Sequence, residues 1–251
     1  MPRSAESIRE YVMGLELPES ETRGVSRGRR AKFTDEREVI AVGSQLTEFS
    51  DNVSAELRPL ISNSMLLAQL AANKATLDAE NVFNWHLKYR DVLNNIGWQI
   101  TDKEEQVQQI GNKSLTVHQA IIPVLTAMLG PAVAATSMVV SVLEGLQEMD
   151  ADSPWITLFD RQSRHAHGAK FQISYVDASE GEPAISLLGC AIQAERTITQ
   201  VLFFKFSSQR AELRRTTSTL ATTASRLTSD KEVIEARVQS FIADFVKNID
   251  V

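Results

Sequence analysis

Apolar residues recur at spacings of three and four along residues 34–71, which is the pattern of one face of an amphipathic helix. The stripe begins near Val42, reaches Ala71, and keeps its phase across Pro59. A proline inside a helix removes one backbone hydrogen bond, so we expect a kink at this position. Because so long a helix is most stable beside antiparallel neighbours, residues 34–150 are predicted to form a helical bundle.

Two further helices are predicted in the same part of the chain. The first follows Asp78 and has an apolar face that runs from Val82 to Ile96. The second is short and polar, because Thr101 and Glu104 have the spacing of a capping box. Both helices would be members of the predicted bundle.

The pattern changes after residues 150–154, where alternating apolar and polar positions replace the helical spacing. Strands are predicted around residues 171–175, 185–194 and 202–223, with loops short enough for antiparallel pairing. A terminal amphipathic helix begins at Ser229 and should cover one face of the sheet. The predicted fold class is therefore α+β: an N-terminal helical bundle with long helices, followed by a small antiparallel β-sheet and a C-terminal amphipathic helix. The predicted domains are residues 1–33, 34–150 and 151–251.

No Asp, Glu, Lys or Arg occurs from residue 114 to residue 143, and we call this stretch the uncharged segment. It is long enough to cross a bilayer, which takes about 20 apolar residues, but Pro123, Gly130 and Pro131 interrupt it. Two interpretations stay open. The segment forms helices buried in the protein core, with Pro131 starting the second helix, or it is an apolar hairpin that is hidden at first and later enters lipid. The candidate residues for membrane insertion are Ile121, Ile122, Val124, Leu125, Met128, Leu129, Val133, Met138, Val139, Val140, Val142 and Leu143.

The composition is that of a globular protein, with 43% hydrophobic and 23% charged residues. Cys190 is the only cysteine, which excludes an intramolecular disulfide and a cysteine-based zinc site. The formal net charge of −6 argues against nucleic acid as a partner, because nucleic-acid binding needs a basic face.

Residues 1–33 are predicted to be a flexible arm with a short helix and a basic cluster. The basic cluster consists of Arg23, Arg27, Arg29, Arg30 and Lys32. It would act as a solvated tether or contact anionic lipid, nucleic acid or an acidic partner. Charged residues Glu6 and Arg9 interrupt any apolar run near the start, so we expect no signal peptide. Synthesis in the cytoplasm is expected, and any export would use a non-classical route.

The chain contains none of the common short catalytic motifs, including the P-loop, Gly-x-Ser-x-Gly and His-Glu-x-x-His. The one constellation with metal-ligand chemistry is Asp160, His165 and His167, because residues two apart on an extended segment point the same way. The neighbouring Arg161 and Lys170 add positive charge, which disfavours a cation. We therefore predict no catalytic residue, no cofactor and no metal, and keep these three residues as a weak candidate.

In outline, a helical body with an interrupted uncharged segment and a small β region resembles the layout of α-helical pore-forming toxins, although no motif of such a family is present. The resemblance implies a non-enzymatic, membrane-active protein whose uncharged segment inserts into lipid and which forms homo-oligomers or binds a protein partner. One alternative is a soluble interaction or assembly protein that acts through helix-bundle and sheet-edge contacts. The other is an enzyme without sequence-local motifs, with the loop around Asp160 as its site.

Overall fold

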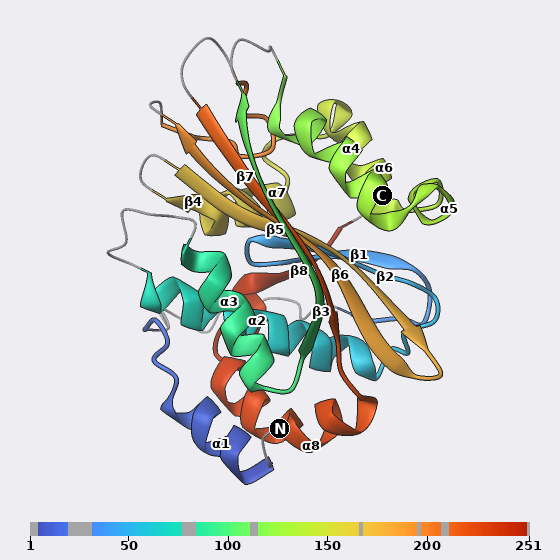
Figure 1. Ribbon diagram of the computed structural model, residues 1–251, viewed down its shortest axis with the longest axis vertical. Coiled ribbons are helices and arrows are strands. Elements are labelled where there is room, and N and C mark those ends of the chain that lie inside the picture. The colour runs from blue at the N-terminus through green and yellow to red at the C-terminus, as the bar shows by residue number, and fades with distance from the viewer. Residues whose placement is uncertain are drawn as a thin grey trace.

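A mixed β-sheet runs through the middle of the molecule and separates two layers of helices in the computed structural model (Figure 1). The structure describes residues 5–19, 32–76, 84–110, 115–165, 168–194, 197–206 and 211–249. For residues 5, 102–105 and 107–110 it describes the backbone alone.

The strands of the sheet come from both halves of the chain. They are β1 (Glu38–Val42), β2 (Gln45–Phe49), β3 (Gln99–Ile110), β4 (Arg164–His165), β5 (Gly168–Ser179), β6 (Glu182–Ala194), β7 (Ala211–Ala221) and β8 (Val246–Asn248). Their order across the sheet is β3-β7-β6-β5-β2-β1-β8, and β4 pairs with β5. Neighbouring strands are antiparallel except β2 and β5, which pair in parallel.

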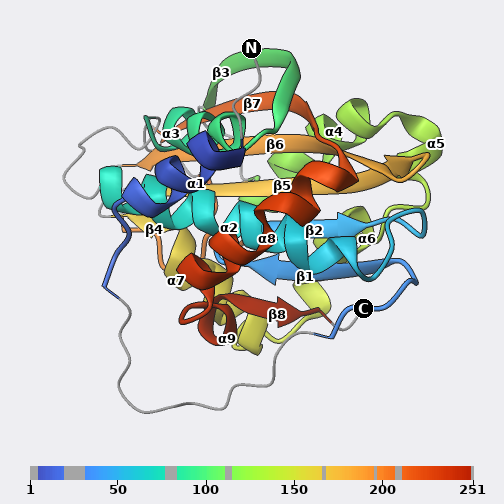
Figure 2. The same cartoon turned by 90° about the horizontal axis from the view of Figure 1, so that it is seen from below.

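One face of the sheet is covered by α1 (Ala5–Gly14), α2 (Leu57–Ala75), α3 (Asn84–Asn95) and α8 (Ala224–Val238). Figure 2 shows α1, α2 and α8 in front of the strands. The core of this layer contains Met65, Trp85 and Trp98, together with Ile40 and Val42 from β1. We call it the first core.

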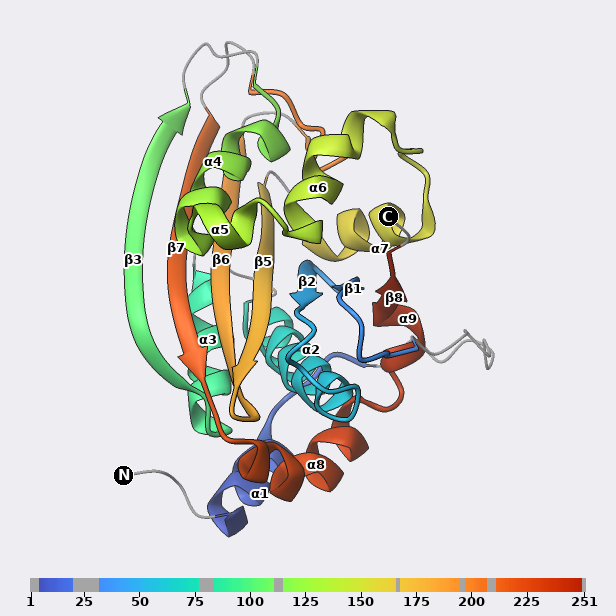
Figure 3. The ribbon, with the colours of Figure 1, turned by 90° about the vertical axis from the view of Figure 1, so that its right-hand side faces the viewer.

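The opposite face is covered by α4 (Val117–Leu129), α6 (Met138–Glu144) and α7 (Pro154–Ser163), with α5 (Pro131–Ala134) between α4 and α6. A 3₁₀ helix, η1 (Gly145–Glu148), follows α6, and α9 (Ile242–Phe245) precedes β8. Figure 3 shows α4 and α5 lying over β6 and β7. The second core lies here and includes Phe159, Phe171 and Cys190, with Val39 and Ala41 from β1.

The predicted fold class is wrong: a large mixed sheet replaces the N-terminal bundle followed by a small antiparallel sheet. Residues 38–49 form a β-hairpin, and the helix starts only at Leu57. Alternate residues of β1 enter the two different cores, so both faces of the strand are apolar. A strand buried on both faces has no polar alternation, and its apolar residues then imitate a helical stripe. Pro59 lies in the first turn of α2, where a missing N–H costs no helical hydrogen bond.

Two other segments also differ from the predicted elements. The described part of the predicted polar helix, residues 101–110, belongs to β3, which pairs with β7. A strand at the sheet edge has one exposed flank, and its polar side chains gave no apolar alternation to identify it. The terminal helix ends at Val238, and the chain then returns to the sheet as β8 beside β1.

The domain boundary predicted at residues 150–154 falls in the turn before α7. Strands from both sides of this turn belong to one sheet, because β2 pairs with β5 and β3 pairs with β7. Whether the two parts fold separately stays a prediction.

Candidate functional site

The uncharged segment forms three short helices, α4, α5 and α6, on the second face of the sheet. Thr116 and Gln119 form a capping box at the start of α4, with the Thr116 N–H donating to Gln119 Oε1 at 3.0 Å. Gly130 ends α4 with a φ of 78°, a conformation in which glycine carries no steric penalty. Pro131 then occupies the first turn of α5. These residues account for the interrupted helix that the sequence predicted.

The insertion candidates divide evenly between the interior and the surface. The buried members are Ile121, Leu125, Val139, Val140, Val142 and Leu143. The half-buried members are Ile122, Val124, Met128, Leu129, Val133 and Met138. The first set belongs to the second core, while the second set reaches the surface of α4, α5 and α6. The outer face of the segment therefore carries half-buried apolar side chains beside exposed polar ones such as Gln119 and Ser141, and it has no charged side chain.

A buried carboxylate holds the start of α6 on the sheet. Glu48 on β2 is 0% exposed, and its Oε2 accepts hydrogen bonds from Ser137 Oγ at 2.6 Å and from the Val139 N–H at 3.0 Å. Ser137 is also the N-cap of α6, since its Oγ accepts from the Val140 N–H. A negative charge at the positive end of a helix is electrostatically favourable.

Arg37 completes this contact from the segment before β1. Its Nη1 donates to the Thr136 carbonyl at 2.6 Å and lies 3.9 Å from Glu48 Oε1. The Oε1 atom itself is buried and accepts no hydrogen bond within the described residues. We call Arg37 and Glu48, with their contacts on residues 136–139, the α6 anchor.

The α4 end of the segment is less completely packed. A cavity of about 540 Å³ separates Val124 and Met128 on α4 from Arg215, Thr217 and other polar side chains of the sheet. Arg215 Nη2 donates to Gln106 Oε1 at 2.9 Å, but its buried Nε has no hydrogen-bond partner among the described residues. The part of the sheet that lines this cavity is therefore polar.

The weak metal candidate is not assembled in the described part of the chain. Asp160 is buried and accepts a hydrogen bond from the Val201 N–H at 2.8 Å, and burial raises its pKa. His165 is half-buried on β4, and His167 lies outside the described residues. Across the described ranges, no group of three or more His, Cys, Asp and Glu side chains could hold a metal ion.

Most of the basic cluster, namely Arg23, Arg27, Arg29 and Arg30, also lies outside the described residues. Lys32 is described, and its backbone N–H donates to Asn248 Oδ1 at 3.2 Å. Asn248 Nδ2 donates in return to the Lys32 carbonyl at 3.0 Å, so this end of the cluster lies beside β8.

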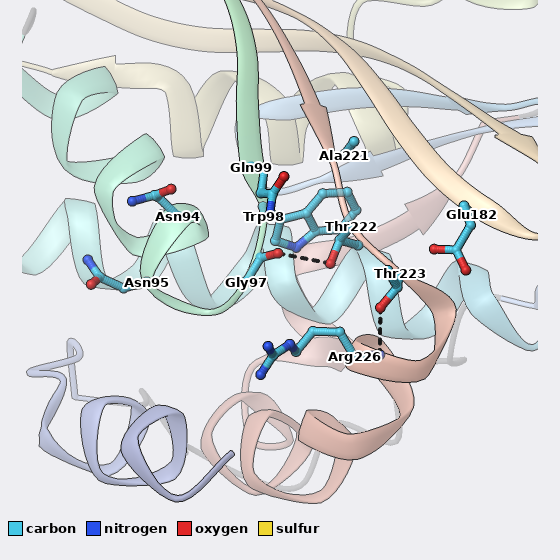
Figure 4. A pocket seen from close by; sticks show the side chains of 10 residues that line it. All are labelled: Asn94, Asn95, Gly97, Trp98, Gln99, Glu182, Ala221, Thr222, Thr223 and Arg226. Carbon is cyan, nitrogen blue, oxygen red and sulfur yellow. Dashed lines mark hydrogen bonds between the residues drawn. The ribbon is translucent and has the colours of Figure 1, made fainter. Parts of the chain in front are cut away.

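A wider cavity of about 820 Å³ lies where α3, β3 and the start of α8 meet (Figure 4). Thr222 Oγ1 donates to the Gly97 carbonyl at 3.0 Å, and Thr223 Oγ1 accepts from the Arg226 N–H at 3.1 Å as the N-cap of α8. Trp98 lines the cavity, and its buried Nε1 has no hydrogen-bond partner in the described part of the chain. Of the two hydrogen bonds drawn in Figure 4, one joins the residue after β7 to the loop before β3 and the other caps α8, so both have a structural role.

Two residues of the α6 anchor were not identified from the sequence. Glu48 and Arg37 gave no signal, because a single acid and a single arginine in a chain with 32 acidic and 26 basic residues look like ordinary surface charges.

Within the described helices, none combines the length and the apolar character needed to cross a membrane.

No protein-family model matches the chain, and no curated protein matches it. Among solved structures, a delta-endotoxin is similar at 18% identity and a TM-score of 0.37, over 72% of this chain and 84% of the other. The activated Cyt2Ba monomer from Bacillus thuringiensis subsp. israelensis is similar at 12% identity and a TM-score of 0.37, over 77% and 98%. The Evf virulence factor is similar at 16% identity and a TM-score of 0.34, over 99% and 92%. TM-scores this low support no assignment of family or function.

Proposed function

We propose that the protein acts on lipid membranes, and that α4, α5 and α6 leave the sheet and enter the lipid. The observation that carries this proposal is the absence of charge on both faces of the uncharged segment. A surface helix of a protein that stays in water normally has a charged or polar outer face. Here the outer face presents half-buried Ile122, Val124 and Met128, and its exposed polar residues, such as Gln119, carry no charge.

The first contact with lipid uses the half-buried side chains of α4 and α5. Burying apolar surface gains about 25 cal/mol per Å², and no charged group on these helices has to be dehydrated. An apolar patch at the protein surface is typical of sites that contact membranes or other proteins.

Full entry of the segment requires the α6 anchor to break. The buried candidates, including Leu125 and Val139, become available to lipid only when the helices separate from the second core. The cavity beneath α4 lowers the cost of this separation, because the side chains around it lack contacts on one side.

The lengths of the helices limit the form in which they enter. With 13 residues, α4 is about 20 Å long, whereas the hydrocarbon core of a bilayer is about 30 Å thick. We therefore propose that α4 and α6 enter together as a hairpin that lies partly in the interfacial region, and that several copies of the chain assemble. Small residues at the α4–α5 connection, such as Gly130 and Ala132, permit close helix contacts in lipid.

The experiment is dye release from liposomes by the wild type and by a Val133→Asp variant. Val133 is half-buried on α5, so an aspartate there leaves the cores intact while opposing entry into hydrocarbon. The matched control is Leu87→Asp, because Leu87 is a 52% exposed apolar residue on α3, across the sheet from the segment. We expect release by the wild type and by the Leu87→Asp variant, and at least a tenfold slower release by the Val133→Asp variant.

Equal release by all three folded proteins would contradict entry of the uncharged segment. No release from any lipid composition, together with a stable oligomer in the absence of lipid, would favour the assembly alternative. The backbone of β3 pairs with a neighbouring strand on one side among the described residues, and it offers an edge for that kind of contact.

A further inference from the structure

A third cavity, of about 550 Å³, lies at the end of α7 and carries an excess of positive charge. Arg161, Arg164 and Lys170 line it, together with His165. The carboxylates that line it are Glu19 and Asp244, so the three cations outnumber the acids even when His165 is neutral. A local positive excess is unusual in a chain whose net charge is −6.

Lys170 is the residue that an ordinary structural role does not explain. Its side chain is on β5 and is 8% exposed. The ammonium donates one hydrogen bond, to the Gln162 carbonyl at 3.0 Å, and lies 4.9 Å from the centre of the Trp85 ring. No carboxylate of the described residues lies within ion-pair distance of it. Burial lowers the pKa of Lys170 to about 8.

A buried ammonium without an anionic partner is unfavourable, because the protein replaces only part of its hydration. Lysine has three donors, and within the described residues only one of them has a protein acceptor, the Gln162 carbonyl. The cavity beside the ammonium is the space from which a bound anion could supply the missing charge.

The two arginines offer further donors to the same cavity. Arg161 Nη2 donates to the Asp244 carbonyl at 3.4 Å, and Arg164 Nε donates to the Asp160 carbonyl at 3.2 Å. These two arginine contacts satisfy carbonyls near the ends of α9 and α7, which is a common role of basic side chains at helix ends. A guanidinium has five donors, so one carbonyl leaves most of its hydrogen-bonding capacity unused.

Part of the cavity lining is apolar and aromatic. Phe241 and Phe245 line it, with ring centres 5.9 Å apart in an edge-to-face arrangement, and Leu70 of α2 lies nearby in the wall. An anionic group with an attached apolar or uncharged portion would therefore find both kinds of surface in one cavity.

We propose that this cavity binds a phosphate group, with Lys170 and Arg164 as its principal ligands. Guanidinium forks and a lysine ammonium are the side chains that suit phosphate oxygens best. The phosphate belongs to a phospholipid headgroup or to a small phosphate ester, since the chemistry of the recognition is the same. The site is separate from the uncharged segment, and the inference holds whether or not that segment enters lipid.

The test measures binding of two probes to the full chain. Titration calorimetry with glycerol 3-phosphate detects recognition of a free phosphate ester. Flotation with phosphatidylcholine vesicles, with and without phosphatidic acid, detects recognition of the same group in a membrane. We expect binding to at least one of the two probes, glycerol 3-phosphate and phosphatidic acid. Any binding to vesicles of phosphatidylcholine alone should not depend on this cavity.

Two variants assign that binding to the cavity. Lys170→Met keeps the length of the side chain and removes its charge, and Arg164→Gln changes an exposed residue with little risk to folding. Each is expected to weaken phosphate binding at least tenfold. Lys247→Met is the matched control, because Lys247 also donates to one backbone carbonyl, that of Ala243 at 2.9 Å, but does not line the cavity.

Each pattern of results decides the proposal. Binding of glycerol 3-phosphate that both variants lose supports a site for small phosphate esters. Binding only to vesicles with phosphatidic acid, again lost in both variants, supports a headgroup site. Absence of binding to either probe, or binding that both variants retain, overturns the inference. The Val133→Asp variant should bind glycerol 3-phosphate as the wild type does, which separates this result from the test of membrane entry.

Discussion

At the scale of single residues, buried polar side chains connect the helices to the sheet. Glu48 contacts α6 on one face, while Gln45 on the same strand accepts a hydrogen bond from Tyr89 of α3 at 2.8 Å on the other face. His86 of α3 lies 2.9 Å from the Cys190 carbonyl through its Nε2, which therefore donates to that oxygen. Such contacts select one arrangement of apolar layers that could otherwise slide past one another.

The stability of the protein should fall in mildly acidic solution because of His86. Burial lowers its pKa from 6.5 to about 4, so below pH 6.5 the unfolded chain binds a proton that the folded protein does not. The contribution of His86 is complete above pH 6.5 and is lost as the pH falls toward 4. At pH 5 the loss should be about 2 kcal/mol of unfolding free energy.

Urea unfolding at pH 7.5 and pH 5 measures this loss. A His86→Gln variant retains a donor for the Cys190 carbonyl and should show a smaller difference between the two pH values than the wild type. The same pH dependence in both proteins would assign the effect to other groups. His165→Gln serves as the control, since that histidine is half-buried and should leave the wild-type dependence in place.

Removing the charge of Glu48 should loosen α6. Glu48→Gln keeps the size of the side chain but replaces charged acceptors with a neutral amide, so the expected loss is about 1–3 kcal/mol of unfolding free energy. Hydrogen exchange at the Val139 and Val140 amides should become faster than in the wild type, because both N–H groups depend on the α6 anchor. Glu232→Gln, at an exposed position on α8, is the control and should change neither quantity.

At the scale of elements, the β1–β2 hairpin depends on a two-residue turn. Gly43 has a φ of 57°, and a Cβ at this position would lie 2.5 Å from Gln69 Oε1. That oxygen accepts from the Ser44 N–H at 2.9 Å, and Gln69 Nε2 donates to the Val42 carbonyl at 2.8 Å. The turn is therefore fitted to a side chain of α2, and glycine is required both for its conformation and for its size.

Two glycine substitutions separate these requirements. At the β5–β6 turn, Gly181 has a φ of 81°, and a Cβ added there would have no neighbouring atom within 4 Å. Gly181→Ala should therefore lower the unfolding free energy by about 1 kcal/mol through backbone strain alone. Gly43→Ala should cost about 1–3 kcal/mol more, because it also displaces Gln69. Equal losses in chemical denaturation would contradict the role of the Gln69 contact.

At the scale of the whole molecule, the sheet makes the two cores dependent on each other. Strands β1 and β2 contribute side chains to both cores, and β2 joins the two halves of the chain through β5. Loss of either helix layer would expose one face of the same strands.

We therefore expect one cooperative unfolding transition. Trp85 and Trp98 report on the first core, while Trp155 reports on the second. Thermal unfolding is followed by fluorescence in a Trp155→Phe variant and in a Trp85→Phe/Trp98→Phe variant. The two fluorescence midpoints should be equal once the difference in stability between the variants, measured by circular dichroism, has been subtracted. Separate midpoints for the two probes would contradict a single folding unit.

The sequence by itself determined the features that depend on local chemistry. The absence of charge from residue 114 to residue 143, the proline at the start of α5 and the helical spacing of Trp85, Tyr89 and Val92 all correspond to helices in the structure. The alternation at Phe171 and Ile173 corresponds to β5. Capping, helical periodicity and strand alternation act over a few residues, so one segment of sequence is enough to identify them.

Only the tertiary structure decided which segments meet. The β1–β2 hairpin was hidden because its strands are buried on both faces, and pairing of β2 with β5 joins residues more than 120 positions apart. Glu48 and Lys170 have no distinctive neighbours in sequence, and their roles arise from burial against distant elements. A charged side chain is well hydrated at the surface, but its burial costs free energy unless it is paired. The role of a charged residue therefore depends on its three-dimensional surroundings and not on its place in the chain.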